Sequence, residues 1–366
     1  MRLQKLDVQA YTIPTDSPEA DGTIAWNSTT MVLVTAHAEN GQTGIGYTYA
    51  HRAAVSVIRG KLAEAVQDVP VFQTGQAWQR MVNTVRNLGR PGVASHAISA
   101  VDIALWDLKA KILGVPLFLL LNCHRDSVPI YGSGGFTTYS DERTREQLSG
   151  WVAQGISRVK IKIGEKWGTA VAEDIRRVAL AREIIGPDVE LMIDANGGYT
   201  AKQAIRLGRL YANDYGVTYF EEPTSSDHLQ QLRLIRENTP LAVAAGEYGY
   251  SPWYFRDMLR AGAVDILQAD VTRCLGITGW LMAADLAYGF DIPLSAHTSP
   301  TLHVHVGCAA PQLDHIEYFY DHVRIEKMFF DGVSEPQAGR LYPDPQRPGL
   351  GITLKQSDAA PYLLDV

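Results

Sequence analysis

From residue 128 onward, short apolar segments alternate with longer amphipathic ones. The short segments have the length and the Val, Ile and Tyr content of buried strands, and eight of them occur: 128–134, 158–164, 190–196, 217–223, 241–247, 265–270, 292–297 and 314–319. Helical periodicity marks the stretches between most of them, for example 169–186, 200–214 and 276–289. A doubly wound open sheet would give the same alternation locally, but eight repeats favour an α/β fold closed into a parallel barrel.

The first part of the chain has a different pattern. Residues 2–13 and 30–37 have strand character, glycines punctuate the turn and strand that follow, and residues 52–69 and 95–113 have helical periodicity. The segment 17–29, which joins the first two strands, is either a solvated hairpin loop or a flap over a substrate, and both interpretations stay open. We therefore predict three parts: an α+β domain over 1–125, the barrel over 126–325, and a C-terminal segment over 326–366 that packs back on the first domain.

Length and composition argue against several functional classes. The chain has 366 residues, more than one average domain, and its 46% apolar and 20% charged residues are ordinary for a globular protein. A net charge of −7 gives no support for nucleic-acid binding, and neither the N-terminus nor the apolar run 116–121 resembles a signal peptide or a membrane span. Cys123, Cys274 and Cys308 are scattered and lack zinc-ligand spacing. We expect a reduced, cytoplasmic protein with no membrane or nucleic-acid partner.

Three carboxylates close consecutive predicted strands: Asp194, Glu221 and Glu247. Taken singly, each acid is more commonly a helix cap or a surface charge, but apolar residues precede all three at strand spacing. In a parallel barrel the C-terminal strand ends meet at one mouth, so these side chains converge there. Carboxylates that converge in a buried place need a cation, and oxygen ligands favour Mg²⁺. Glu222 points to the opposite face of its strand, and we expect it to be structural.

Two lysines, Lys160 and Lys162, share one face of the strand that precedes the first of these acids. A single lysine at a strand end is normally a solvated charge. Two that point into the same buried mouth repel each other, and burial adds to the effect, so we expect a lowered pKa. A lysine with a lowered pKa can act as a general base, a role that we assign to Lys162. We expect Lys160 to tune the charge and to contact a substrate carboxylate.

Asp270 and His297 end the sixth and seventh barrel strands, which should be adjacent. A lone histidine is more often a core residue, but an aspartate that accepts from one imidazole nitrogen leaves the other nitrogen for proton transfer. His303 and His305 lack such a partner, and we expect them to be structural. Glu317 ends the eighth strand, and we expect it to donate a hydrogen bond to a substrate oxygen if burial keeps it protonated.

Six short motifs, in this order along the chain, resemble those of the enolase superfamily: VKIKIG, MIDAN, FEEP, AAGE, QAD and SAH. The Lys-x-Lys pair with the Asp/His dyad resembles the mandelate racemase subgroup, and the resemblance spans the whole chain. It implies an α+β capping domain on a modified (β/α)₇β TIM barrel, one Mg²⁺ per subunit, and a homo-oligomer between dimer and octamer. By the same resemblance Asp194, Glu221 and Glu247 match the metal ligands. Lys162 and His297 match the two groups that transfer protons on opposite faces of the substrate. Asp270 matches the partner of the histidine, and Glu317 matches the residue beside the enolate oxygen.

The chemistry that this family shares is removal of the α-proton of a small-molecule carboxylate, which leaves an enediolate that Mg²⁺ stabilises. We predict dehydration of a sugar acid (aldonate or aldarate) to a 2-keto-3-deoxy acid, because the flap segment offers many hydrogen-bonding groups and because TLHVH and the PGLG tail look like those of acid-sugar dehydratases. A 2-hydroxy-acid racemase or epimerase and a sugar-lactone cycloisomerase are the alternatives. A barrel that only binds a ligand would be expected to lack one of these residues, and none is missing. The expected substrate contacts are Asn196, Ser133, Glu19, Trp26, Tyr47 and His51.

Overall fold

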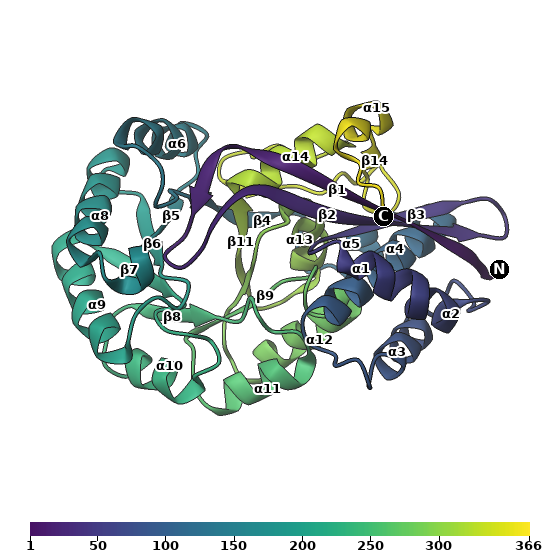
Figure 1. Cartoon of the computed structure of the whole chain (residues 1–366), viewed down its shortest axis with the longest axis horizontal. Coiled ribbons are helices and arrows are strands. Elements are labelled where there is room, and N and C mark those ends of the chain that lie inside the picture. Colours follow the sequence, from purple (N-terminus) through teal and green to yellow (C-terminus); the bar gives the residue numbers. More distant parts are fainter.

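The computed structural model describes residues 1–366 and shows two packed parts (Figure 1). The first part contains a three-stranded antiparallel sheet of β1 (Leu3–Ala20), β2 (Ala25–Ala38) and β3 (Thr43–Tyr49), in the order β1-β2-β3. The segment 17–29 is therefore not a loop: β1 and β2 continue through most of it, with a register shift before a tight turn over residues 21–24. The resulting long hairpin, purple in Figure 1, reaches across the barrel.

Helices cover one face of this sheet: α1 (Ala53–Val57), a π-helix (Ile58–Leu62), α2 (Ala63–Val66), α3 (Thr74–Thr84) and α4 (Val93–Leu113). The short α5 (Leu117–Leu120) follows and packs with the larger core that continues into the barrel. The sequence pattern predicts α4 and the stretch that contains α1 and α2, and it gives no signal for α3. Gly44 and Gly46 of β3 lie directly against α4, where an added Cβ would stand 2.4 Å from backbone atoms of Ala104. These glycines therefore serve the close approach of helix and sheet.

The second part is a closed barrel of eight parallel strands, as the spacing predicts. Its strands are β4 (Val128–Gly134), β5 (Arg158–Lys162), β6 (Glu190–Asp194), β7 (Val217–Glu221), β8 (Ala242–Ala245), β9 (Ile266–Ala269), β10 (Leu294–Ala296) and β11 (Leu313–Phe319). Pairing of β11 with β4 closes the ring, with Ile316 opposite Ile130. Seven long helices connect the strands: α6 (Asp141–Ala153), α8 (Val171–Ile185), α9 (Ala201–Tyr215), α10 (Leu229–Arg236), α11 (Pro252–Arg260), α12 (Gly276–Gly289) and α13 (Pro300–Ala309). With a single turn, α7 (Glu165–Gly168), after β5, this arrangement confirms the predicted fold class.

After β11 the chain returns to the N-terminal sheet. The last elements are α14 (Tyr320–Phe329), β12 (Phe330–Asp331), β13 (Arg340–Leu341), β14 (Thr353–Leu354), α15 (Gln356–Ala359) and a 3₁₀ helix (Ala360–Tyr362). Leu363 forms a bridge with Tyr11, and the Leu364 amide donates to the Ala10 carbonyl at 2.8 Å, so the C-terminus lies on β1. The domain boundaries at 125 and 325 stay a prediction, and the second of them falls inside α14. No helix of the chain has the length and apolar character needed to cross a membrane.

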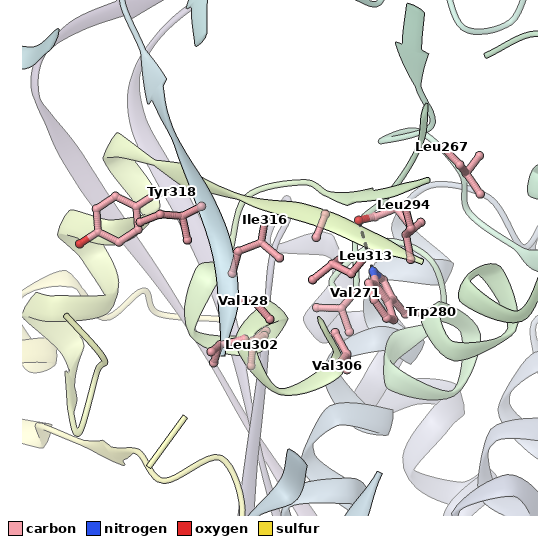
Figure 2. Packing of buried hydrophobic residues seen from close by; sticks show 14 of the residues in the cluster. Val128, Leu267, Val271, Trp280, Leu294, Leu302, Val306, Leu313, Ile316 and Tyr318 are labelled. Atoms are coloured by element: carbon pink, nitrogen blue, oxygen red, sulfur yellow. Dashed lines mark hydrogen bonds between the residues drawn. The ribbon is translucent and has the colours of Figure 1, made fainter. Parts of the chain in front are cut away.

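Alternate residues of the N-terminal sheet face two hydrophobic cores. Val32 of β2 belongs to a cluster of 28 buried residues between the sheet and α1–α4, whereas Leu33 belongs to a cluster of 69 that continues into the barrel. Figure 2 shows part of the larger cluster, where the Trp280 indole of α12 donates to the Ala269 carbonyl of β9 at 3.4 Å. Each fully buried Leu or Val side chain contributes about 1.5–3 kcal/mol. The shared core therefore holds the sheet in place over the barrel mouth.

Candidate active site

Three carboxylates lie together at the barrel mouth. Asp194 and Glu221 end β6 and β7 and stand opposite each other in the ladder, and Glu247 follows β8 by two residues. One oxygen of each lies within 4.8 Å of the others, and all three side chains are buried. Glu221 Oε1 and Glu247 Oε2 have no hydrogen-bond partner. Buried carboxylate oxygens without partners are costly, and this donor set fits a divalent cation that takes oxygen ligands.

Burial and neighbouring charged groups shift the pKa of the triad residue Glu221. Burial raises the pKa of Glu221 to about 7, while Lys160 opposes the rise and Asp194 adds to it. Asn196 follows the first acid with its backbone in the left-handed region (φ 45°), and its amide donates to Asp194 Oδ1 at 2.8 Å. Its side-chain oxygen is buried without a partner. The loop after β6 thus adds one more unpaired oxygen to the edge of the site.

Both lysines of β5 point into the barrel but occupy different places. Lys160 is fully buried, with its Nζ 2.6 Å from Glu221 and 2.9 Å from Glu317, and it does not line the cavity at the mouth. Lys162 lies nearer the mouth, 2.5 Å from Asp194. Two carboxylates of the protein hold the Lys160 ammonium group, and its contact with a substrate carboxylate stays a prediction.

The carboxylates alone give the opposite of the predicted lysine pKa shift, and a lowered pKa with Mg²⁺ bound stays a prediction. Burial lowers the pKa of Lys162, and so does Lys160, but Asp194, Glu317 and Glu247 outweigh them and raise it above its ordinary value. Lys160 does lower the pKa of Lys162, as predicted. The carboxylates that raise it come from other strands, and their closeness to Lys162 cannot be read from the sequence. Two of these carboxylates are members of the triad that would hold a cation.

His297 and Asp270 lie within hydrogen-bond distance. His297 Nδ1 is 2.8 Å from one oxygen of Asp270, and the amide and hydroxyl of Thr272 both donate to the other oxygen. With its Nδ1 proton directed at Asp270, the imidazole presents Nε2 to the triad, 3.3 Å from Glu247 Oε2. Burial lowers the pKa of His297, but Glu247 and Asp270 outweigh it and raise the pKa above its ordinary value. The ring is thus oriented, and its protonated form is favoured.

Glu317 does not have the protonation state that we expected. It accepts from the Ser133 hydroxyl at 2.5 Å and from the Thr298 amide at 2.9 Å, and it pairs with Lys160. Burial raises its pKa, but Lys160 and His297 outweigh this effect and hold the pKa well below its ordinary range. Glu317 is therefore a charged acceptor rather than a donor. Ser133, predicted as a substrate contact, is instead fully buried and bound to this carboxylate.

A cavity of about 470 Å³ lies between the barrel mouth and the β1–β2 hairpin. Lys162, Glu247 and His297 line its barrel side. The hairpin forms part of the opposite wall, and its tip is docked on the barrel, where the Trp167 amide donates to the Gly22 carbonyl at 2.9 Å. Of the two interpretations of segment 17–29, the structure therefore favours the flap.

Half of the expected substrate contacts line this cavity: Asn196, Trp26 and His51. Tyr47 does not, because it is fully buried and donates its hydroxyl to Glu326 at 2.7 Å. Glu19 is also fully buried and accepts from the Trp26 indole at 2.9 Å, and burial raises its pKa to about 8. The predictions for Tyr47, Glu19 and Ser133 are corrected accordingly, since each of these side chains binds a neighbouring residue of the protein.

Arg273 and His322 are among the cavity residues that are absent from the sequence predictions. Arg273 lies 3.0 Å from Glu247 and 3.3 Å from Asp270, so it bridges the triad and the histidine's partner. His322 of α14 stacks on Tyr49 of β3, with ring centroids 3.5 Å apart. The arginine follows a strand-ending Asp by three residues, a signal that was available in the sequence. No local sequence pattern indicates His322, because its place at the cavity depends on the path of the chain after β11.

Two family models match the chain. The N-terminal domain of mandelate racemase / muconate lactonizing enzymes matches residues 10–122, and the enolase C-terminal domain-like family matches residues 143–359. The chain belongs to the mandelate racemase / muconate lactonizing enzyme family. The membership predicted from the six motifs is confirmed, and the two matched ranges contain most of the capping sheet and the barrel strands β5 to β11.

Several members of this family are similar to the chain over most of its length. A D-galactarolactone cycloisomerase of Agrobacterium fabrum is 35% identical over 287 residues, which cover 77% of this chain and 74% of the relative. The L-talarate/galactarate dehydratase of Salmonella typhimurium is 31% identical over 335 residues, 89% of this chain and 81% of the relative. Its structure with Mg and L-lyxarohydroxamate has a TM-score of 0.90 at 27% identity by superposition, over 100% of this chain and 93% of that one. A mandelate racemase/muconate lactonizing enzyme-like protein from Rubrobacter xylanophilus has a TM-score of 0.96 at 49% identity over 100% of both chains.

Proposed function

We propose that this protein is a magnesium-dependent dehydratase that converts a sugar acid to a 2-keto-3-deoxy acid. One observation supports the proposal most directly: Lys162 and His297 Nε2 face the same cavity, with the carboxylate triad between their strands. Removal of an α-proton and loss of a β-hydroxyl require a base, an acid and stabilisation of a developing charge at one place. The family relatives named for galactarate and galactarolactone support a sugar acid as the substrate class.

Magnesium fits the site on chemical grounds. Asp194, Glu221 and Glu247 offer three buried carboxylates, two of which have an oxygen without a partner, and the structure of the Salmonella relative contains Mg. When bound, Mg²⁺ supplies positive charge beside the substrate carboxylate and offsets the second negative charge that appears as the α-proton leaves. In this proposal the triad holds one ion per subunit.

Lys162 and His297 divide the proton transfers between them. Lys162 Nζ takes the proton from C2, and the electron pair of the broken C–H bond moves toward the carboxylate to form an enediolate. That electron pair then forms a C2–C3 double bond as the C3–O bond breaks. His297 Nε2 gives its proton to the departing hydroxyl, which leaves as water, while Asp270 accepts from Nδ1. The resulting enol loses the proton of its C2 hydroxyl and gains one at C3, which gives the 2-keto-3-deoxy acid. Lys160 and Glu317, paired at 2.9 Å, act as positioning residues beneath these groups.

A sugar-lactone cycloisomerase is the second candidate function. The observation in its favour is the cycloisomerase of Agrobacterium fabrum, which is 35% identical to this chain. Such a reaction begins with the same proton removal, and a ring oxygen takes the place of the hydroxyl as the leaving group. The two activities therefore use one site and differ in substrate and product.

Proton NMR in D₂O with Mg²⁺ tests the proposal against a library of aldonic acids, aldaric acids, their lactones and simple 2-hydroxy acids. The expected result is loss of an α-proton signal together with new C3 signals of a 3-deoxy product, both abolished by EDTA. Loss of an α-proton together with ring opening in a lactone, with no reaction of the open-chain acids, would favour the cycloisomerase, and α-proton exchange without elimination would favour a racemase or epimerase. Silence across the library with Mg²⁺ shown to bind would overturn the substrate class, and silence without Mg²⁺ binding would overturn the metal site.

We also propose that the protein is a homo-oligomer, as the family resemblance implies. Light scattering should give a mass that is a multiple of 40.3 kDa. A mass of one chain would contradict this proposal.

A further inference from the structure

The lysine and arginine that line the cavity both lie on its barrel side, beside the triad. Lys162 lies 2.5 Å from Asp194, and the Arg273 guanidinium lies 3.0 Å from Glu247. No other lysine or arginine lines the cavity. Arg52, next to the rim of the cavity, lines a separate surface depression. On the side away from the barrel, a negatively charged substrate group would therefore meet no lysine or arginine.

Two histidines, His51 and His322, line the cap side of the cavity, which is the wall formed by the β1–β2 hairpin, the end of β3 and α14. His51 Nδ1 accepts from the Ala53 amide at 3.2 Å, and His322 Nδ1 accepts from the Ser299 amide at 3.4 Å. Burial holds the pKa of His322 well below its ordinary value. The buried imidazole of the cap side therefore adds no positive charge.

Carboxylates lie in and behind this cap side. Asp21 lines the cavity and accepts from two backbone amides of the hairpin turn through one oxygen, Oδ1. Behind the wall, Asp321 accepts from the hydroxyl of Thr29 at 2.5 Å and pairs with Arg324 at 2.7 Å. Burial and the charge of Asp321 raise the pKa of the neighbouring Glu19 to about 8. The Asp21 carboxylate at the cavity therefore disfavours a second anion on the cap side.

Neutral polar groups and aromatic rings make up much of the remaining cap side. The Tyr49 hydroxyl is buried at the cavity without a hydrogen-bond partner, and Ser28 and Thr30 add two more hydroxyl groups. Trp26 and Phe319 contribute ring surfaces. A buried hydroxyl without a partner is unfavourable, and a substrate hydroxyl would supply that partner.

We propose that the substrate is a monocarboxylic polyhydroxy acid of the aldonate class. Its one carboxylate lies at the triad, and an uncharged, hydroxyl-bearing tail lies against the cap side. This inference rests on the proposed function and narrows its substrate class from aldonates and aldarates to aldonates. The terminal carboxylate of an aldarate would be buried near Asp21 with no cation to pair with, which is a costly arrangement for a charge.

The test compares aldonates with aldarates of the same configuration at C2 to C5, so that each pair differs only in whether C6 is CH₂OH or carboxylate. The wild-type enzyme with Mg²⁺ is followed by α-proton loss in D₂O. At least one aldonate should turn over with a kcat/KM about 100-fold above that of its paired aldarate. A ratio below about tenfold overturns the inference and leaves the proposed function standing. Reaction of no member of either series overturns both.

Asp21→Asn tests whether the cap side causes the discrimination. Asparagine keeps the oxygen that accepts from the hairpin turn and removes one negative charge, so the aldarate-to-aldonate ratio of kcat/KM should rise about fivefold at low salt. Asp188→Asn, in the exposed turn before β6 at the other end of the barrel, removes the same charge and should leave the ratio unchanged. An unchanged ratio in Asp21→Asn, or an equal rise in both variants, overturns the role of Asp21.

Discussion

Replacing Asp270 with asparagine should slow turnover without weakening substrate binding. Asp270 does not line the cavity; it contacts His297 Nδ1 at 2.8 Å, the amide and hydroxyl of Thr272 at 2.7 and 2.8 Å, and Arg273 at 3.3 Å. Asparagine keeps an oxygen for Thr272 and loses the charge that stabilises the imidazolium. A hydrogen bond to a charged group is worth about 1.5–3 kcal/mol, so kcat should fall roughly 10- to 150-fold while KM changes little.

Steady-state dehydration at saturating Mg²⁺ measures this effect, with melting temperatures to check folding. Asp285→Asn, at an exposed position of α12, is the matched control and should retain wild-type kinetics. Because Asp270 helps to raise the pKa of His297, its loss should lower that pKa, and kcat should then decline at a lower pH as the solution becomes alkaline. A kcat within about threefold of wild type, or a raised KM with unchanged kcat, would refute this reasoning.

Three further predictions concern the charges of the fold. Lys160→Met leaves Glu221 and Glu317 buried without their shared cation. The free energy of unfolding in urea should therefore fall by about 3–5 kcal/mol. A loss below about 1 kcal/mol would contradict this prediction. Mg²⁺ should raise the melting temperature progressively with its concentration, and Asp194→Asn should remove that response; a wild-type melting temperature insensitive to Mg²⁺ would argue against a cation at the triad. Burial raises the pKa of Glu326 from 4.5 to about 7, so its contribution to stability is complete below pH 4.5 and is lost as the pH rises toward 7. Glu326→Gln should remove that part of the pH dependence in thermal unfolding, and an unchanged profile would show that another group causes it.

The positions of the central residues follow from one local rule. Asp194, Glu221 and His297 each stand at or just after the end of a short apolar run, and barrel closure brings the ends of all such runs to one mouth. Both steps depend on the alternation of strands and helices, which is visible in the sequence. The convergence of these side chains was therefore predictable without knowledge of their packing.

The charge states of the site could not be predicted from the sequence, because they depend on distances between residues of different strands. Lys160 is close to Lys162 along the chain, yet its nearest charged groups are Glu221 of β7 and Glu317 of β11. Lys160 and His297 reverse the expected protonation of Glu317, and Asp194, Glu317 and Glu247 raise the pKa of Lys162. Only the folded arrangement contains this information.

The contacts from the cap were the least predictable part of the site. Tyr47 and Tyr49 share one face of β3, but only Tyr49, at the strand end, lines the cavity, while Tyr47 contacts Glu326 of the returning tail. The turn formers of segment 17–29 likewise left a loop and a flap equally open, whereas the ladder between β1 and β2 extends through most of it. Register and the path of the C-terminal segment decide both cases.

Solvent-deuterium exchange at C2 in two single variants, with a substrate that the wild type dehydrates, tests the division of roles between Lys162 and His297 most directly. His297→Asn should exchange the α-proton and release no product, because Lys162 still removes the proton, whereas Lys162→Ala should do neither. Lys202→Ala and His124→Asn, at exposed positions outside the cavity, are matched controls and should behave as the wild type. Undiminished exchange in Lys162→Ala, or dehydration at the wild-type rate in His297→Asn, would contradict the proposed mechanism.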